Sequence, residues 1–120
     1  MSANTHRVAV YGPLRRGKSN HALLVDQQFI GRTTLTAITL YDLGEYPGAK
    51  LEQSDGVVVE IYDVSPEVMQ QLDQFEDYDP EQPSHGLYDR KRLHTSFGLA
   101  WVYLYNPEVQ GAKPIRAGAW

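Results

Sequence analysis

The pattern of apolar and polar residues along the chain predicts five short β-strands. Apolar residues alternate or cluster in five runs, which glycine, proline or Asp-Gly turns separate. These runs cover residues 7–11, 33–43, 57–64, 87–96 and 99–105. Residues 44–48 contain two glycines and a proline, so they predict an irregular loop. A turn near Phe97 and Gly98 separates the last two runs, which indicates a strand pair.

Residues 66–75 follow the helical period instead. Ser65 stands at the N-cap position, and Pro66 occupies the first helical position, where the missing N–H of proline is tolerated. The apolar side chains that recur at the spacing i, i+4 and i+7 are Val68, Leu72 and Phe75. This spacing predicts an amphipathic helix that buries one face.

The remaining elements complete an α+β fold. Residues 20–26 predict a second, short helix with Ser19 or Asn20 as its cap, and residues 107–120 show no clear period. The strands and helices are grouped rather than strictly alternating, which favours the α+β class. We therefore expect a small mixed β-barrel of about five or six strands with flanking helices.

Composition narrows the classes of function. A chain of 120 residues with 42% hydrophobic and 22% charged residues is typical of a single globular domain, here residues 1–120. The formal net charge of −4 argues against a nucleic-acid partner. Because the chain has no cysteine, disulfides and thiolate metal sites are excluded.

Targeting and metal-binding signals are missing from the sequence as well. The polar N-terminus shows no signal peptide, and no apolar run reaches the roughly 20 residues that cross a bilayer, so we expect a cytoplasmic protein with no membrane partner. The four histidines have no paired spacing, so no metal site is expected. We expect a monomer or a weak homodimer.

Residues 8–19, VAVYGPLRRGKS, permit two interpretations. Gly12, Gly17, Lys18 and Ser19 satisfy the phosphate-loop pattern G-x-x-x-x-G-K-[ST]. The same letters also describe a strand followed by a loop whose backbone amides hold a carboxylate. Phosphate-loop enzymes need several parallel strands with crossover helices, whereas this chain offers one helix after residue 64 and then consecutive strands. The carboxylate-binding interpretation is therefore favoured.

The second half of the chain supports this choice through a resemblance. The motifs are Tyr11-Gly12-x-Leu14-Arg15-Arg16-Gly17, Tyr41-Asp42-x-Gly44-x-Tyr46-Pro47, Glu60-x-Tyr62, Leu72-Asp73-x-x-Glu76-x-Tyr78, Tyr88-x-Arg90 and Ile115-x-x-Gly118-x-Trp120. In this order they resemble the γ-glutamylcyclotransferase-like family, also called the AIG2-like family, over nearly the whole chain. The resemblance implies a small β-barrel with flanking helices. It also implies a cofactor-free reaction that cyclises a small-molecule γ-glutamyl substrate to 5-oxoproline and releases an amine.

The same resemblance implies the site residues. Glu76 matches the catalytic glutamate of the family. The loop formed by Tyr11, Gly12, Pro13 and Leu14 would hold the α-carboxylate of the substrate, and Tyr88 would hydrogen-bond the substrate or Glu76. Arg90 is expected to form a structural ion pair.

The position of Glu76 at the end of the predicted helix suggests why it suits proton transfer. The helix dipole there disfavours negative charge, neighbouring aromatic residues exclude water, and Asp73 and Asp77 add like charge. Each effect would raise the pKa of Glu76.

Three functions remain open at this point. The first is a cyclotransferase with Glu76 as the proton shuttle. The second is a non-catalytic module that binds a small carboxylate, which Pro13 favours because the family usually has serine or threonine there. The third is a phosphate-loop nucleotide hydrolase.

Overall fold

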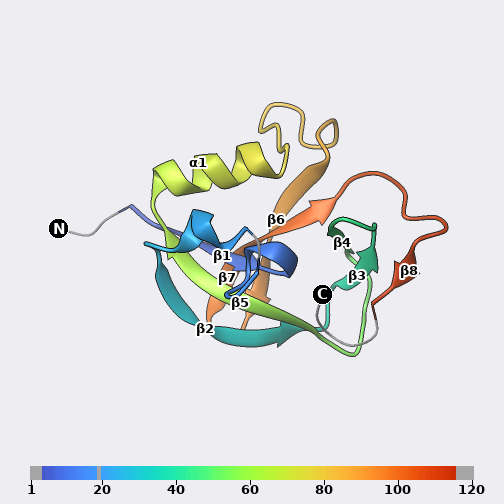
Figure 1. Ribbon diagram of the computed structural model, residues 1–120, viewed down its shortest axis with the longest axis horizontal. Helices are drawn as coiled ribbons and strands as arrows, with labels where there is room; N and C mark the ends of the chain where they lie inside the picture. Colours follow the sequence, from blue (N-terminus) through green and yellow to red (C-terminus); the bar gives the residue numbers. More distant parts are fainter. Residues whose placement is uncertain (1–3, 19, 116–120) are drawn as a thin grey trace.

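A five-stranded sheet in the order β2-β5-β1-β7-β6 forms the centre of the computed structural model, which describes residues 4–18 and 20–115 (Figure 1). Its strands are β1 (His6–Val10), β2 (Gln28–Leu35), β5 (Val57–Val64), β6 (Tyr88–Thr95) and β7 (Gly98–Tyr105). A smaller sheet in the order β4-β3-β8 consists of β3 (Thr39–Asp42), β4 (Pro47–Lys50) and β8 (Lys113–Pro114). The helical elements are the 3-10 turns η1 (Gly12–Leu14) and η2 (His21–Leu24) and the helix α1 (Pro66–Phe75).

The larger sheet is mixed. β5 pairs antiparallel with both β1 and β2, whereas β1 pairs parallel with β7, where Val8 lies opposite Trp101. β6 and β7 form a hairpin with Tyr88 opposite Tyr105 and Thr95 opposite Gly98. Since β1 lies between β5 and β7, the loop that follows β1 starts at the centre of the sheet.

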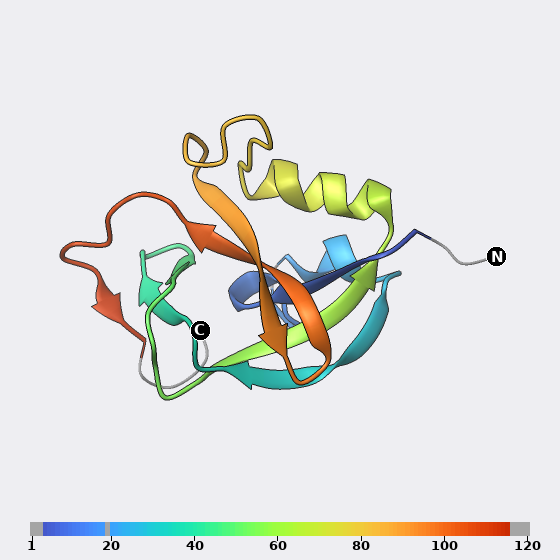
Figure 2. The same cartoon turned by 180° about the vertical axis from the view of Figure 1, so that it is seen from behind.

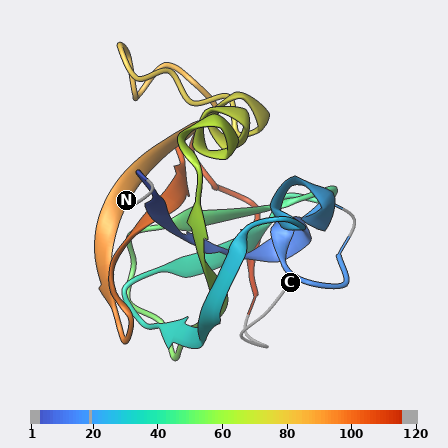
Figure 3. The same ribbon diagram turned by 90° about the vertical axis from the view of Figure 1, so that its left-hand side faces the viewer.

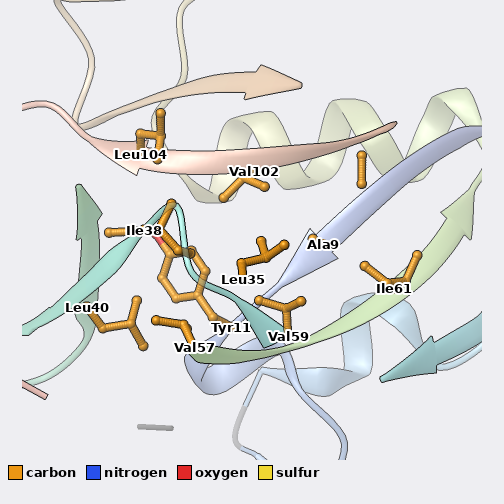
Figure 4. Close-up of a cluster of buried hydrophobic side chains, with 12 residues drawn as sticks. Ala9, Tyr11, Leu35, Ile38, Leu40, Val57, Val59, Ile61, Val102 and Leu104 are labelled. Carbon is orange, nitrogen blue, oxygen red and sulfur yellow. The ribbon is translucent and has the colours of Figure 1, made fainter. Parts of the chain in front are cut away.

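Alternating side chains separate two hydrophobic cores, one on each face of this sheet. Val8 and Val10 of β1 point toward α1 and η2 and pack with Leu24, Met69 and Leu72. The opposite face packs against the smaller sheet, and Figure 4 shows this cluster. Its members include Ala9, Tyr11, Leu35, Ile38, Leu40, Val57, Val59, Ile61, Val102 and Leu104. The helical elements and the smaller sheet therefore cover different faces of the same strands.

The five-stranded sheet curls strongly, as the view along the molecule shows (Figure 3). The turn between β6 and β7 reaches β2, where the Ser96 hydroxyl donates a 2.7 Å hydrogen bond to Thr33 Oγ1. Gly31 provides the room for this approach, because a Cβ atom there would lie 2.3 Å from the ring of Phe97. Figure 2 shows the hairpin of β6 and β7 crossing in front of the other strands. The α+β mixed-sheet fold is confirmed, although no backbone ladder joins β2 to β6 and the described strands form two sheets instead of a closed barrel.

The helix at residues 66–75 and the strand at 57–64 have the predicted bounds. The Ser65 hydroxyl caps α1 by accepting a 3.2 Å hydrogen bond from the N–H of Val68. The buried face of α1 consists of Met69 and Leu72, so the prediction that Phe75 would be buried is wrong. Phe75 is 48% exposed.

The prediction of one continuous strand over residues 33–43 is also wrong. The chain leaves the larger sheet after Leu35 and enters the smaller sheet at Thr39. Ser54 stabilises this break, because its N–H donates to the Thr36 carbonyl and its hydroxyl donates to the Ile38 carbonyl. The short helix at 20–26 is a 3-10 turn with no side-chain cap at Asn20, and Ser19 lies outside the described residues.

Candidate active site

A cavity of about 270 Å³ opens where α1 ends, beside the loop after β1, the β3–β4 loop and the start of β6. Its lining residues are Tyr11, Pro13, Leu14, Asn20, Glu45, Tyr46, Pro47, Phe75, Glu76, Leu87 and Tyr88. Five of the six site residues predicted from the sequence line it, namely Tyr11, Pro13, Leu14, Glu76 and Tyr88. The sixth, Gly12, lies against Pro47 instead.

Glu76 takes its position from the end of α1. It is the C-cap residue, and its N–H still donates to the Leu72 carbonyl at 2.9 Å. Its side chain is partly buried at the cavity wall. Burial raises the pKa of Glu76 from 4.5 to about 8, because desolvation penalises the charged carboxylate. A carboxyl with this pKa can both accept and donate a proton near neutral pH.

The neighbouring acids do not produce this shift, contrary to the sequence-based expectation. Asp73 is engaged elsewhere, because Tyr103 donates to it at 2.7 Å and Arg90 pairs with it at 3.2 Å. The side chain of Asp77 accepts a hydrogen bond from the N–H of Leu87. The raised pKa of Glu76 therefore follows from burial in the cavity wall.

The ion pair of Arg90 is structural, as the sequence suggested. The Arg90 guanidinium lies 4.8 Å from the ring centre of Tyr78 and 4.3 Å from that of Trp101. With Asp73 it ties α1 to β6 and β7. This arrangement supports the end of the helix from which Glu76 projects.

The hydroxyl groups of both predicted tyrosines donate hydrogen bonds to backbone carbonyls. Tyr88 donates to the Pro47 carbonyl at 2.7 Å, and Tyr11 donates to the Tyr103 carbonyl at 2.6 Å. Burial, together with the charge of Glu76, raises the pKa of both phenols. Since a tyrosine has one hydroxyl hydrogen, each oxygen is left with acceptor capacity only. Tyr88 can therefore accept a hydrogen bond from a bound ammonium group.

The loop after β1 is held in one conformation by hydrogen bonds around it. Gly12 adopts a φ of +69°, which glycine permits, and its missing Cβ makes room for Pro47. The N–H of Asn20 donates to the Pro13 carbonyl at 2.9 Å, which closes the loop. Pro13 has no N–H to offer a ligand.

Glu60 also fixes this loop, through a hydrogen bond to its backbone. This carboxylate is 1% exposed on β5 and accepts a 2.8 Å hydrogen bond from the backbone N–H of Arg16. It also accepts from the Tyr62 hydroxyl and pairs with Arg32, each at 3.2 Å. The sequence analysis quoted Glu60 in the motif Glu60-x-Tyr62 but assigned it no role. The useful signal was an acid inside a strand of buried valines, because such a charge needs partners.

Sequence reasoning also missed several cavity residues. They are Asn20, Glu45, Tyr46, Pro47 and Leu87, with Phe75 assigned to the core instead. Tyr46 and Pro47 stood in a quoted motif, which was the available signal. None of the described lining residues is lysine, arginine or histidine. A ligand carboxylate must therefore be met by backbone N–H groups and neutral side chains.

Comparisons with known proteins identify the family of the chain. The family model for gamma-glutamyl cyclotransferase, AIG2-like, matches residues 8–120. The chain belongs to this family. It is 40% identical over 116 residues to a Vibrio cholerae protein named as a candidate gamma-glutamylcyclotransferase, with 96% of this chain and 95% of that protein covered.

Two further members of the γ-glutamylcyclotransferase family extend the comparison. The Escherichia coli family protein YtfP is 32% identical over 95% of both chains, and its solution structure superposes with a TM-score of 0.74. A Niallia circulans protein named gamma-L-glutamyl-butirosin B gamma-glutamyl cyclotransferase is 36% identical over 102 residues. That match covers 81% of this chain and 65% of the relative.

The phosphate-loop alternative does not fit the γ-glutamylcyclotransferase fold. A short 3-10 turn follows the loop where a phosphate loop needs a helix, and Glu60 already occupies the N–H of Arg16. Ser19, Gly118 and Trp120 of the sequence motifs lie outside the described residues. Within residues 4–18 and 20–115, no helix is long and apolar enough to cross a membrane, and no acidic or histidine cluster is arranged to hold a metal.

Proposed function

We propose that this protein cyclises a γ-glutamyl amine or γ-glutamyl amino acid to 5-oxoproline, with Glu76 as the proton shuttle. The observation that supports this most directly is a carboxyl with a pKa of about 8 in the wall of a cavity that also contains the Tyr11–Leu14 loop. The reaction is an internal acyl transfer, so atoms balance without a cofactor. Membership of the γ-glutamylcyclotransferase family supports the same chemistry.

The reaction forms one C–N bond, breaks another and moves two protons, because the α-ammonium nitrogen has three hydrogens and the ring nitrogen of 5-oxoproline has one. The α-amino nitrogen of the substrate attacks its own γ-carbonyl carbon, and a five-membered ring forms through the new C–N bond. Glu76 accepts the proton released from the attacking nitrogen. It then donates this proton to the departing nitrogen as the original amide C–N bond breaks, and the regenerated carboxylate transfers the second proton from the ring nitrogen to the released amine.

The pKa of Glu76 suits both steps. The α-ammonium group of the substrate is a weaker acid than a peptide N-terminus, whose pKa is about 8, because the adjacent α-carboxylate stabilises its charge. A carboxylate with a pKa of about 8 still lies much closer to it than an ordinary glutamate, so proton transfer is less unfavourable. An ordinary glutamate, with a pKa near 4.5, would be a much weaker base toward an ammonium group. Because Glu76 must be ionised to accept the proton, kcat/KM should increase with pH up to about 8.

The other lining residues are positioned to orient the substrate. The Tyr88 oxygen can accept from the α-ammonium group, since its own hydrogen is committed to Pro47. Backbone N–H groups of the loop and the side-chain amide of Asn20 are the donors available for the α-carboxylate. Holding both ends of the glutamyl group brings the amine toward the carbonyl, and such positioning accelerates ring closure strongly.

Replacing Glu76 with glutamine tests this assignment. We expect Glu76→Gln to lower kcat by at least about a hundredfold, because glutamine keeps the shape but cannot carry the proton. The assay incubates the protein with a panel of γ-glutamyl amines and dipeptides and measures 5-oxoproline by mass spectrometry. Glu81→Gln, an exposed acid outside the cavity lining, is the control and should retain wild-type activity.

Two results would contradict the proposal. Full activity of Glu76→Gln would exclude Glu76 as the shuttle. Absence of product from the whole panel would favour the non-catalytic module that binds a small carboxylate, and binding of 5-oxoproline measured by calorimetry would then support that alternative. The missing N–H of Pro13 is the feature that favours it.

A further inference from the structure

A second hollow lies directly beside the cavity that contains Glu76. Its volume is about 510 Å³, and it lies between η2 and α1. Its lining residues are Asn20, Ala22, Leu23, Val25, Asp26, Gln27, Val68, Gln71 and Phe75. We call this hollow the η2–α1 groove. Asn20 and Phe75 also line the first cavity, so the groove and the cavity are adjacent.

The groove follows one face of α1 away from Glu76. Val68, Gln71 and Phe75 are three and four residues apart, so they lie along one side of the helix. Phe75 is at the end nearest Glu76, and Val68 is two turns farther away. The opposite wall is formed by η2 and the residues that follow it.

Exposed apolar side chains are concentrated here. In the described part of the chain, four large hydrophobic residues are exposed: Val25, Leu51, Phe75 and Leu99. Val25 is 66% exposed and Phe75 is 48% exposed, and both line the groove. Apolar surface in a hollow next to a reaction cavity is typical of a ligand site.

The size of the first cavity indicates what occupies the groove. Its volume of about 270 Å³ is below the ~300 Å³ at which sites for drug-sized ligands begin, so it suits the γ-glutamyl group alone. The departing nitrogen must lie next to Glu76 to receive its proton. Phe75, the neighbour of Glu76 in the chain, lines both hollows, so a substituent on that nitrogen can extend past Phe75 into the groove along α1.

We propose that the η2–α1 groove binds the substituent of the leaving amine, and that the enzyme prefers γ-glutamyl amides of amines with an extended apolar chain. The groove has one acidic lining residue, Asp26, and no basic one among the described residues. It therefore disfavours an amine that carries a carboxylate. This inference rests on the proposed cyclotransferase function and specifies the substrate class of the same site.

A series of γ-glutamyl alkylamides tests the groove. The methyl, propyl, butyl and hexyl amides are compared by kcat/KM for 5-oxoproline formation. We expect an increase of roughly two- to fourfold for each added methylene until the groove is filled, since each buried methylene contributes that factor. The γ-glutamyl derivative of glutamate should be the poorest substrate.

Two variants distinguish the groove from general hydrophobic binding. Val25→Ser makes one wall polar and should flatten the dependence of kcat/KM on chain length. Leu99→Ser removes a similarly exposed apolar side chain on β7, outside the groove, and should leave the dependence as in the wild type.

The outcomes separate this inference from the proposed function. Equal kcat/KM for all alkylamides would overturn the groove assignment and leave the cyclotransferase function standing. No 5-oxoproline from any amide would overturn both. A change in sedimentation coefficient on Val25→Ser, with an unaltered chain-length dependence, would show that the groove is an interface between copies and would also overturn the assignment.

Discussion

At the scale of single residues, the burial of Glu76 links function to stability. Its carboxyl stays neutral in the folded protein up to about pH 8, whereas the unfolded chain ionises above about 4.5. The folded state therefore binds more protons over this interval, and the free energy of unfolding falls as the pH increases. Each pH unit corresponds to about 1.4 kcal/mol for a full proton difference.

Glu76→Gln should therefore stabilise the protein at high pH. We expect wild type and variant to be similar at pH 4.5, where the glutamate is neutral, and the variant to be more stable by roughly 2 to 4 kcal/mol at pH 8. Urea unfolding at both pH values measures the difference. Glu67→Gln, in the exposed first turn of α1, is the control and should not stabilise. An equal effect of Glu76→Gln at both pH values would contradict the prediction.

Glu60 gives a second prediction at this scale. Glu60→Ala leaves the N–H of Arg16 and the hydroxyl of Tyr62 without their acceptor, so we expect a loss of roughly 2 to 4 kcal/mol in the free energy of unfolding. Glu60→Gln keeps an acceptor oxygen and should lose less than half as much.

Arg32→Ala separates the hydrogen bonds of Glu60 from its ion pair. The Arg32 side chain is 62% exposed, so this variant should cost under about 1 kcal/mol. Chemical denaturation of the three variants measures these differences. If Arg32→Ala loses as much stability as Glu60→Ala, then Glu60 stabilises the protein mainly through its ion pair and not through its hydrogen bond to the loop amide.

At the scale of elements, local signals predicted well where local interactions decide the structure. The serine cap, the proline and the apolar spacing gave the correct bounds of α1, since all three act within a few residues. Residues 33–43 were different, because their break depends on Ser54, which is far away in the sequence. The cavity residues Tyr46 and Pro47 were missed as site residues for the same reason. They come close to the end of α1 only through tertiary contacts, which local sequence signals do not show.

The cap of α1 can be tested directly. Ser65→Ala should lower the free energy of unfolding by about 1 kcal/mol, because the N–H of Val68 loses its partner. Ser65→Asp should retain most of the stability, since aspartate caps equally well and favours the positive end of the helix dipole. Thermal unfolding of both variants measures this. Equal losses for alanine and aspartate would indicate a role for Ser65 other than capping.

At the scale of the whole molecule, the curl of the sheet brings the functional segments together. The Tyr11–Leu14 loop reaches the cavity from β1 at the centre of the sheet, and Tyr88 reaches it from β6 at the edge. The sheet can curl because Gly31 has no side chain, so the ring of Phe97 packs directly against the backbone of β2. The sequence carried no visible sign of this pair, whose members are separated along the chain and meet only in the folded sheet.

Gly31→Ala should therefore disturb the curl. Its Cβ would lie 2.3 Å from the Phe97 ring, so the ring must move, and we expect a loss of roughly 1 to 3 kcal/mol in the free energy of unfolding. In a Phe97→Ala background the obstruction is gone, and Gly31→Ala should be neutral or slightly stabilising, since alanine restricts the unfolded chain more than glycine. A double-mutant cycle measured by urea unfolding tests this non-additivity. Additive losses would show that Gly31 is required for the local backbone of β2 and not for the approach of the hairpin.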